Sequence, residues 1–263
     1  MKNTRKLLSL ILAVLFCLTA VSLSACGEKK AEDVAKVTGA GKMIVGITEY
    51  KPMDYKDENG EWTGFDAEFA RLFAEKLGVT AEFIVIDWDN KLLELESGSI
   101  DCIWNGMTIT AEITSKCAVS EPYVKNQQVV VMKADKAASY ADAESMASLK
   151  FAAEAGSAGE TAIADSIGAA CTAVSAQSDA LLEVASGSVD ACVIDATMAA
   201  AMTGEGTSYA DLAVALELSN EEYGVAFRAN SDLCAKFNEF KKEITDNGKL
   251  KELADKYCLT LVG

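Results

Sequence analysis

The side chains of this sequence that could do chemistry are mainly carboxylates and aromatic rings, because the chain contains no histidine. Nucleophile activation by histidine, histidine general bases and histidine metal ligands are therefore excluded. Eight cysteines are present, but no two have the Cys-x-x-Cys spacing of zinc or thioredoxin-like sites. In an enzyme the acid or base would have to be a carboxylate, and Glu49, Glu154 and Asp195 are equivalent candidates.

Polar residues follow two short apolar segments of the chain. One segment, at 100–104, leads into Asn105, Gly106 and Thr108, and another, at 191–194, leads into Asp195. In open α/β sheets, ligands bind beyond the carboxyl ends of the strands. If both segments are strands, two such edges facing each other would form a cleft. The alternatives are a strand-ending turn for the first group and a helix N-cap for Asp195.

The elements that would position these residues alternate along the chain. The apolar residues between Phe65 and Leu77 recur at spacings of three and four, which is typical of a helix, and Gly78 follows as a stop. Alternating short apolar and amphipathic segments favour βαβ units and parallel sheets. Strands are predicted at 42–47, 80–86, 100–104, 129–132, 150–153, 172–175, 191–194 and 223–228, with helices at 87–96, 159–167, 176–185, 231–246 and 249–257.

An internal repeat divides this alternation into two halves. The segment 92–101, which contains Ser97-Gly98-Ser99 and ends at Asp101, recurs at 181–190 with seven of ten positions identical. Each copy combines a helix end, a glycine turn and the entry to a buried strand. The repeat predicts two lobes built on one plan, with Asp101 and Asp190 capping the turn.

The N-terminus has the pattern of a targeting segment. A basic start is followed by an apolar segment at 7–21, too short for a membrane span, and then by Leu23-Ser24-Ala25-Cys26-Gly27. This resembles a bacterial lipobox, whose cysteine is lipidated and becomes the mature N-terminus. We expect a signal peptide at 1–25, a flexible tether at 26–40 and anchoring on the extracytoplasmic face of the cell membrane. The alternative is an ordinary signal peptide with a chance cysteine.

Composition excludes one class of partner. The 263 residues carry a formal net charge of −16, whereas binding to nucleic acid needs lysine and arginine on the phosphates. We attribute the acidity to solubility and expect a monomer without nucleic-acid partners. Six cysteines follow Cys26, and few or no disulfides are expected among them.

Several short segments, in order, carry a resemblance to a known family. They are Tyr50-Lys51-Pro52-Met53, Gly64-Phe65-Asp66, Asp87-Trp88-Asp89, 101–110, Ser120-Glu121-Pro122-Tyr123, Gly156-Ser157-Ala158-Gly159-Glu160, Asp195 and 223–227. Together they resemble bacterial extracellular solute-binding proteins of family 3, over nearly all of 42–259. The resemblance implies an α/β, two-lobed type II periplasmic-binding-protein fold. Each lobe would be a mainly parallel sheet flanked by helices. Lobe one would comprise 41–127 and 225–263, and lobe two 128–224, joined by two hinge crossovers.

The resemblance also implies a function and a site. The chain would capture an amino acid between its lobes and deliver it to an ABC permease, without a cofactor. Eight residues match ligand-contacting positions: Tyr50 and Trp88 around the ligand's side chain, Asn105, Gly106 and Thr108 on its backbone, Gly156 and Ser157 on its carboxylate, and Asp195 on its ammonium. Core packing is the alternative role for the two aromatic residues.

Two departures from the family pattern bear on the ligand. Ile113 stands where the family usually has an arginine for the ligand carboxylate, and Ala158 replaces a common hydroxyl residue. Acidic residues without that arginine favour a basic amino acid or an amine. Lys116, one helical turn further, is an alternative cation. Two other functions remain open: a cyclohexadienyl-dehydratase-like enzyme on the same fold, and an extracellular sensor or adhesin.

Overall fold

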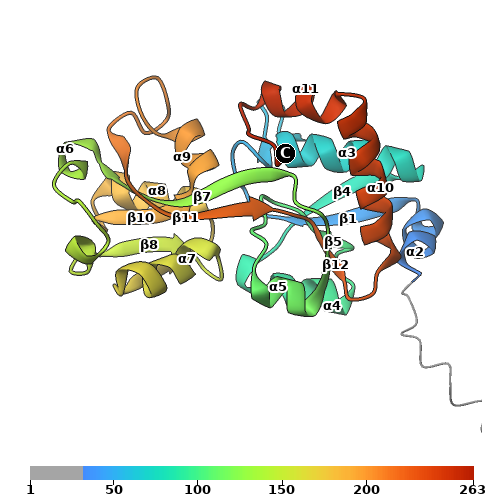
Figure 1. Ribbon diagram of the computed structural model, residues 1–263, viewed down its shortest axis with the longest axis horizontal. Coiled ribbons are helices and arrows are strands. Elements are labelled where there is room, and N and C mark those ends of the chain that lie inside the picture. Colours follow the sequence, from blue (N-terminus) through green and yellow to red (C-terminus); the bar gives the residue numbers. More distant parts are fainter. Residues whose placement is uncertain (1–31) are drawn as a thin grey trace, which may run out of the picture. The chain divides into compact units, whose positions relative to one another are not determined.

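The computed structural model describes residues 32–263, and the expected signal peptide and the lipidation of Cys26 lie outside them. Two five-stranded sheets, one in each lobe, form the frame of the described part (Figure 1). None of the described helices combines the length and the apolar composition needed to cross a membrane. The fold is the two-lobed α/β architecture expected from the sequence.

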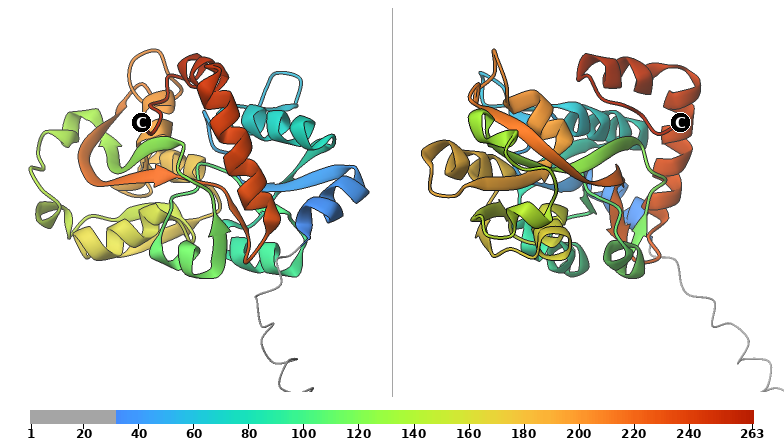
Figure 2. Two further views of the ribbon diagram at one scale, coloured as in Figure 1. Left: turned by 45° about the vertical axis from the view of Figure 1, so that its right-hand side comes forward. Right: turned by 60° about the vertical axis from the view of Figure 1, so that its left-hand side comes forward.

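Lobe one contains the sheet β4-β1-β5-β12-β6. Its central strand β1 (Lys42–Ile47) runs parallel to β4 (Thr80–Val85) and β5 (Cys102–Ile103). Strand β12 (Ala226–Arg228) pairs antiparallel with β5 and with β6 (Cys117–Val119). Helices α3 (Phe65–Leu77), α10 (Asp232–Asp246) and α11 (Lys249–Lys256) lie together beside this sheet (Figures 1 and 2). Aromatic rings, among them Phe69, Trp104 and Phe237, pack edge to face or tilted in the core.

Lobe two contains the sheet β11-β7-β10-β8-β9. Strands β8 (Phe151–Glu154), β9 (Cys171–Val174) and β10 (Ala191–Asp195) are parallel, so their carboxyl ends share one edge. Helices α7 (Ala158–Ala162), α8 (Gln177–Ser186) and α9 (Ala196–Met202) connect these strands or follow them. A π-helical segment, Ile163–Ile167, extends α7.

Two long antiparallel strands, β7 (Val124–Lys133) and β11 (Leu212–Tyr223), join the lobes. Val124 pairs with Tyr223 beside lobe one, and Lys133 pairs with Leu212 at the far end of lobe two. The sequence predicted only 129–132 of the first strand, and its predicted strand at 223–228 corresponds to β12, which begins after β11 has ended. Most of β11 was missed because its second half is polar and most of its residues are partly or fully exposed, as on a sheet edge. The other short elements are β2 (Tyr55–Lys56), β3 (Trp62–Thr63), a 3-10 turn at Trp88–Asn90, α4 (Lys91–Ser97), α5 (Ala111–Lys116), α6 (Ala134–Ala137) and a 3-10 turn at Glu144–Met146.

The internal repeat forms the same hydrogen bonds in both lobes. The hydroxyls of Ser97 and Ser99 are 2.9 Å apart, as are those of Ser186 and Ser188. Asp101 accepts the backbone N–H of Ile44 at 3.0 Å, and Asp190 accepts that of Lys150 at 2.9 Å. The two aspartates therefore bind the start of the neighbouring strand, and the prediction that they cap their own turn is wrong.

The predicted tether at 26–40 is also corrected in part. Asp33–Ala40 forms helix α2, in which Val37 is buried and Asp33 pairs with Arg228 at 2.9 Å. Arg228 also bonds Asp101, so this helix is fastened to the repeat of lobe one. The segment is alanine-rich and has few large apolar residues, so its composition does not indicate a stable helix. Tertiary packing stabilises the helix instead.

Candidate functional site

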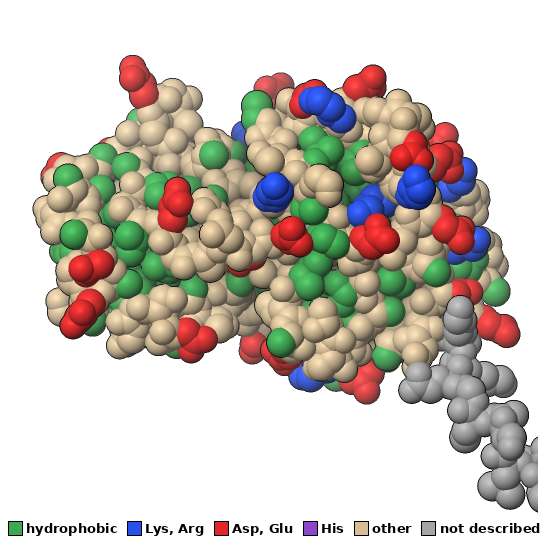
Figure 3. All heavy atoms as spheres, in the orientation of Figure 1, with side chains coloured by type: hydrophobic (Ala, Val, Ile, Leu, Met, Phe, Trp, Pro, Cys, Tyr) green, Lys and Arg blue, Asp and Glu red, His purple; other side chains and the backbone are tan. Residues whose placement is uncertain are grey.

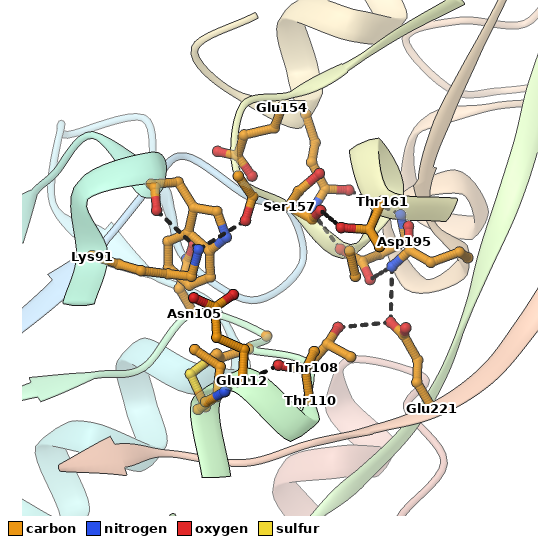
Figure 4. Close-up of a pocket in the computed structure, with 18 of the residues that line it drawn as sticks. Lys91, Asn105, Thr108, Thr110, Glu112, Glu154, Ser157, Thr161, Asp195 and Glu221 are labelled. Atoms are coloured by element: carbon orange, nitrogen blue, oxygen red, sulfur yellow. Dashed lines mark hydrogen bonds between the residues drawn. The ribbon is translucent and has the colours of Figure 1, made fainter. Parts of the chain in front are cut away.

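A cavity of about 350 Å³ lies between the strand ends of the two lobes (Figure 4). Seven of the eight residues predicted to contact a ligand line it, and Tyr50 does not. The full lining is Trp88, Lys91, Asn105, Gly106, Met107, Thr108, Thr110, Ala111, Glu112, Ile113, Gln128, Glu154, Gly156, Ser157, Ala158, Thr161, Gln177, Asp195 and Glu221.

The Tyr50 side chain is buried behind the cavity wall and does not line the cavity as predicted. It is 1% exposed, and its hydroxyl is hydrogen-bonded to Tyr223 and to Thr197 of lobe two. Its ring lies so close to Gly106 that a Cβ there would come within 2.5 Å of the ring. Tyr50 therefore supports the wall of the cavity, and the predicted aromatic pair is reduced to Trp88.

Trp88 follows strand β4 at the start of a 3-10 turn. The Asp87 carboxylate caps this turn by accepting from the backbone of Asp89 and from the side chain of Asn90. The indole packs with the apolar side chains of Met107 and Ile113, and it is 7% exposed. Trp88 thus combines core packing with a place on the cavity wall.

The loop after β5 is held in shape by buried hydrogen bonds. Asn105 exchanges three bonds with Thr48 and donates a fourth to Asp54 at 2.7 Å, so its side chain is engaged within lobe one. Gly106 donates its N–H to Asp66 at 2.6 Å. Thr108 is different, because its hydroxyl donates at 2.8 Å to the carboxylate of Glu221 on β11.

Asp195, the last residue of β10, lies at one end of the cavity. Its carboxylate accepts hydrogen bonds from the side-chain amides of Asn126, Gln128 and Gln177. Asn126 and Gln128 also donate to Glu221, so the two carboxylates share their donors. Burial, followed by the nearby charge of Glu221, raises the pKa of Asp195 well above its usual range.

Glu154, the last residue of β8, lies at another end of the cavity (Figure 4). It is 2% exposed, and its Oε1 atom has no hydrogen-bond partner among the described residues. Burial raises the pKa of Glu154 to about 8, although the nearby Thr48 hydroxyl and the charge of Lys91 act in the opposite direction. The structure therefore holds a buried carboxyl group without a complete set of partners.

The loop at Gly156 and Ser157 forms a reciprocal cap for helix α7. Ser157 Oγ accepts the N–H of Glu160 at 3.1 Å, and the Glu160 carboxylate accepts the N–H of Gly156 at 2.8 Å. One backbone donor that was expected to face a ligand carboxylate is thus already bound. Gly156 has a positive φ of 68° and lies against Asp89 of lobe one, where a Cβ would come within 2.7 Å. Only glycine allows the lobes to approach this closely.

Sequence reasoning missed three charged residues of the cavity, Lys91, Glu112 and Glu221. Lys91 Nζ lies 5.1 Å from the centroid of the Trp88 ring and donates to carbonyl oxygens of Trp88 and Gly156. Glu221 lies on the unpredicted strand β11, so no strand pattern placed it near Asp195. The spacing of Lys91, three residues after Trp88, was the only available indication.

The two residues considered for the ligand carboxylate occupy different places. Ile113 is 3% exposed and lines the cavity with an aliphatic side chain. Lys116 lies outside the lining and pairs with Glu112 at 2.8 Å on the exposed side of α5. Lys116 does not supply a cation to the cavity in this structure.

Acidic side chains outnumber basic ones around the cavity. Glu112, Glu154, Asp195 and Glu221 line it, whereas Lys91 is the only lysine or arginine among its described lining residues. Lobe two as a whole is acidic, with three Lys or Arg and fifteen Asp or Glu between positions 128 and 224. Figure 3 shows lysine and arginine mainly over the lobe that carries α3, α10 and α11.

Comparisons with known proteins agree with this architecture. The arginine-binding extracellular protein ArtP of Bacillus subtilis is 31% identical over 259 residues, covering 94% of this chain and 96% of ArtP. The structure of holo ArgBP from T. maritima has a TM-score of 0.75 and 30% identity, covering 82% of this chain and 94% of that one. Cyclohexadienyl dehydratase of Pseudomonas aeruginosa is 27% identical over only 117 residues, which is 44% of this chain and 43% of the dehydratase.

The family assignment rests on a match over most of the chain. The model of the bacterial extracellular solute-binding proteins, family 3, matches residues 43–260. This range includes both sheets, both connecting strands and every residue of the cavity. The chain therefore belongs to the bacterial extracellular solute-binding proteins, family 3.

Proposed function

We propose that this chain captures an amino acid for an ABC importer and that it prefers one with a positively charged side chain. The observation that carries this proposal is the buried Oε1 atom of Glu154, which has no hydrogen-bond partner within residues 32–263 and borders the same cavity as Asp195. A buried carboxylate is costly without a counter-charge, so a cationic ligand would relieve that cost. The name of ArtP, an arginine-binding protein, supports the same ligand class.

The lining suggests how such a ligand would lie. The α-ammonium would bind at the Asp195 and Glu221 carboxylates, next to the Thr108 hydroxyl. The ligand's side chain would contact Trp88, whose face offers apolar area and attracts cations. Its positive end would then reach Glu154. Each contact would replace water around a charged group with a fixed protein partner.

Closure of the two lobes would complete the site. Lobe one reaches lobe two through the Lys91 bond to Gly156 at 2.8 Å and through the bond between Tyr50 and Thr197. The antiparallel pair β7 and β11 connects the lobes and would serve as the hinge. The ligand would be enclosed between the lobes and released to a membrane permease.

The test is isothermal titration calorimetry of the purified protein with the common L-amino acids. We expect arginine, lysine or histidine to bind with a dissociation constant in the micromolar range or below, on the order of −8 kcal/mol. Tightest binding of glutamate or aspartate would contradict the proposed charge preference. Absence of binding to every amino acid would contradict the proposed function.

One observation favours a second candidate function, an enzyme. A buried carboxyl group with a pKa of about 8, such as that of Glu154, suits a general acid, and a dehydratase is among the relatives. The two functions differ in turnover. The binding proposal expects a ligand to be recovered unchanged after prolonged incubation, whereas conversion of the relative's substrates, lost in Glu154→Gln, would favour the enzyme.

We also propose that the protein is anchored to the extracytoplasmic face of the cell membrane by lipid on Cys26. The lipobox-like sequence before Gly27 supports this proposal. Mass spectrometry of the membrane-extracted protein is expected to find a lipid-modified Cys26 at the N-terminus, and Cys26→Ala is expected to release the protein. An unmodified N-terminus elsewhere would contradict the anchor without affecting ligand binding.

A further inference from the structure

Lys91 is the only lysine or arginine among the residues that line the cavity. It begins helix α4, and its Nζ atom lies over the Trp88 ring, 5.1 Å from the ring centroid. Figure 4 shows the Lys91 side chain pointing into the cavity. Nζ donates to the carbonyl oxygen of Trp88 at 3.1 Å and to that of Gly156 at 2.8 Å. One partner belongs to each lobe, so the ammonium is held at the closure line of the cleft.

The ammonium of Lys91 has no anionic partner in the described part of the chain. Both of its hydrogen bonds go to neutral carbonyls, and an ammonium has three N–H donors, so one donor remains. Burial lowers the pKa of Lys91, while the more distant carboxylates of Glu154 and Glu112 act against that change. A half-buried charge bound only by neutral groups gains most from an incoming anion.

We propose that Lys91 is a specificity-determining residue that binds the carboxylate of the amino acid ligand. This inference rests on the proposed function, because it assigns one group of that ligand. Ile113 offers only an aliphatic wall, and Lys116 lies outside the cavity, paired with Glu112. The third N–H of Lys91 is the remaining charged donor that a carboxylate in this cavity would meet.

Two simpler roles of Lys91 make different predictions. It could merely hold the lobes together through Gly156, in which case its loss would weaken all ligands equally. It could also compete with a cationic ligand for the face of Trp88, in which case its loss would strengthen all such ligands. The ratio of the affinities for an amino acid and for its decarboxylated amine separates these roles. Loss of lobe closure or of competition would change both affinities by the same factor and leave their ratio unchanged, whereas loss of a carboxylate contact would change the ratio.

The experiment measures dissociation constants by calorimetry for L-arginine with agmatine and for L-histidine with histamine. The proteins are wild type, Lys91→Met and the matched control Lys236→Met, which removes an exposed lysine of α10. We expect wild type to bind the amino acid at least about tenfold tighter than its amine. Lys91→Met is expected to bring the two within about threefold, mainly by weakening the amino acid, whereas Lys236→Met keeps the wild-type ratio.

Two further variants protect the test against misfolding and against a purely structural explanation. Thermal unfolding checks that Lys91→Met is folded, and Lys91→Gln replaces it if it is not. Lys91→Arg is expected to restore most of the preference for the carboxylate. An unchanged ratio in Lys91→Met, equal wild-type affinity for both members of each pair, or equal strengthening of both would overturn the inference. Binding of neither these four ligands nor L-lysine by wild type would instead contradict the proposed function on which it rests.

Discussion

Glu154 and Asp195 occupy equivalent places in lobe two but have different surroundings. They end the neighbouring parallel strands β8 and β10, both line the cavity, and their exposures are only 2% and 4%. Asp195 accepts three side-chain amides, whereas Glu154 keeps one oxygen without a partner. The protein itself therefore fills the hydrogen bonds of Asp195, although burial and Glu221 still raise the pKa of its carboxyl group, whereas Glu154 is left to be completed by a ligand.

Among the variants that test this difference, Asp195→Asn is expected to change stability and ligand affinity the most. An asparagine amide would point its NH₂ group at one of the donors Asn126, Gln128 or Gln177, leaving buried donors unpaired at a cost of about 1–3 kcal/mol. The free energy of unfolding should fall by that amount, and affinity for a basic amino acid should fall on the order of a hundredfold. Chemical denaturation and calorimetry measure the two effects. Stability equal to wild type would show that the amide cluster does not depend on the carboxylate.

Trp88→Ala is expected to weaken binding about tenfold or more, because at least about 1.4 kcal/mol of aromatic contact is lost. Since Trp88 also packs with Met107 and Ile113, some stability will be lost with it. Trp62→Ala, at a tryptophan outside the cavity, is the matched control. If a folded Trp88→Ala protein binds with wild-type affinity, the indole does not contact the ligand.

Glu154→Gln makes the same chemical change as Asp195→Asn and should give the opposite result for stability. Glutamine removes a buried charge that has no complete set of partners, so at pH 8 to 9 the free protein should be as stable as wild type or more stable. Affinity for arginine should fall about tenfold because a charge-assisted contact is lost. A clear loss of stability at this pH would mean that the Glu154 carboxylate is already satisfied in the free protein.

The pH dependence of stability gives a smaller, graded test of the same contrast. The folded-state pKa of Glu154 is about 8, above the usual 4.5 of glutamate. The folded protein therefore keeps a proton that the unfolded chain loses, and stability falls as pH rises from about 5 to 8. Glu154→Gln should reduce the slope of stability against pH. A smaller slope should remain in this variant, because the raised pKa of Asp195 also contributes to it. Equal slopes in both proteins would contradict the assignment to Glu154.

Ligand binding should show the corresponding proton release. A cation next to Glu154 favours its ionised form, so affinity for arginine should increase toward pH 8 by up to several-fold per pH unit. Calorimetry in buffers of different ionisation enthalpy detects the released proton. Binding heats that do not depend on the buffer at pH 7 would show that Glu154 does not change its protonation state.

The sequence predicted elements best where one face is apolar throughout. Strand β1 coincides with the predicted 42–47, and helix α3 ends at the predicted Gly78. Helix α2 and strand β11 were missed because each mixes polar residues with small or scattered apolar ones and is ordered by partners far away in the chain, such as Arg228 for α2. Their stability comes from tertiary contacts that no local pattern contains.

Dependence on tertiary contacts also limited the prediction of the site. Residues at the ends of apolar strands, including Trp88, Thr108 and Asp195, line the cavity as the strand pattern and the family resemblance indicated. Lys91 and Glu221 were not predicted, because lysine on a short helix and glutamate on a polar strand are ordinary surface residues in the sequence. Only the packing of the two lobes brings them to one cavity.

A crystal structure of the protein with the basic amino acid that binds most tightly would test this binding mode most directly. We expect the α-ammonium at Asp195 and Glu221, the ligand's side chain against Trp88, and its positive end within hydrogen-bond distance of Glu154 Oε1. A ligand that leaves Glu154 Oε1 unpartnered, or one bound elsewhere, such as in the cavity lined by Lys51 and Tyr55, would contradict it.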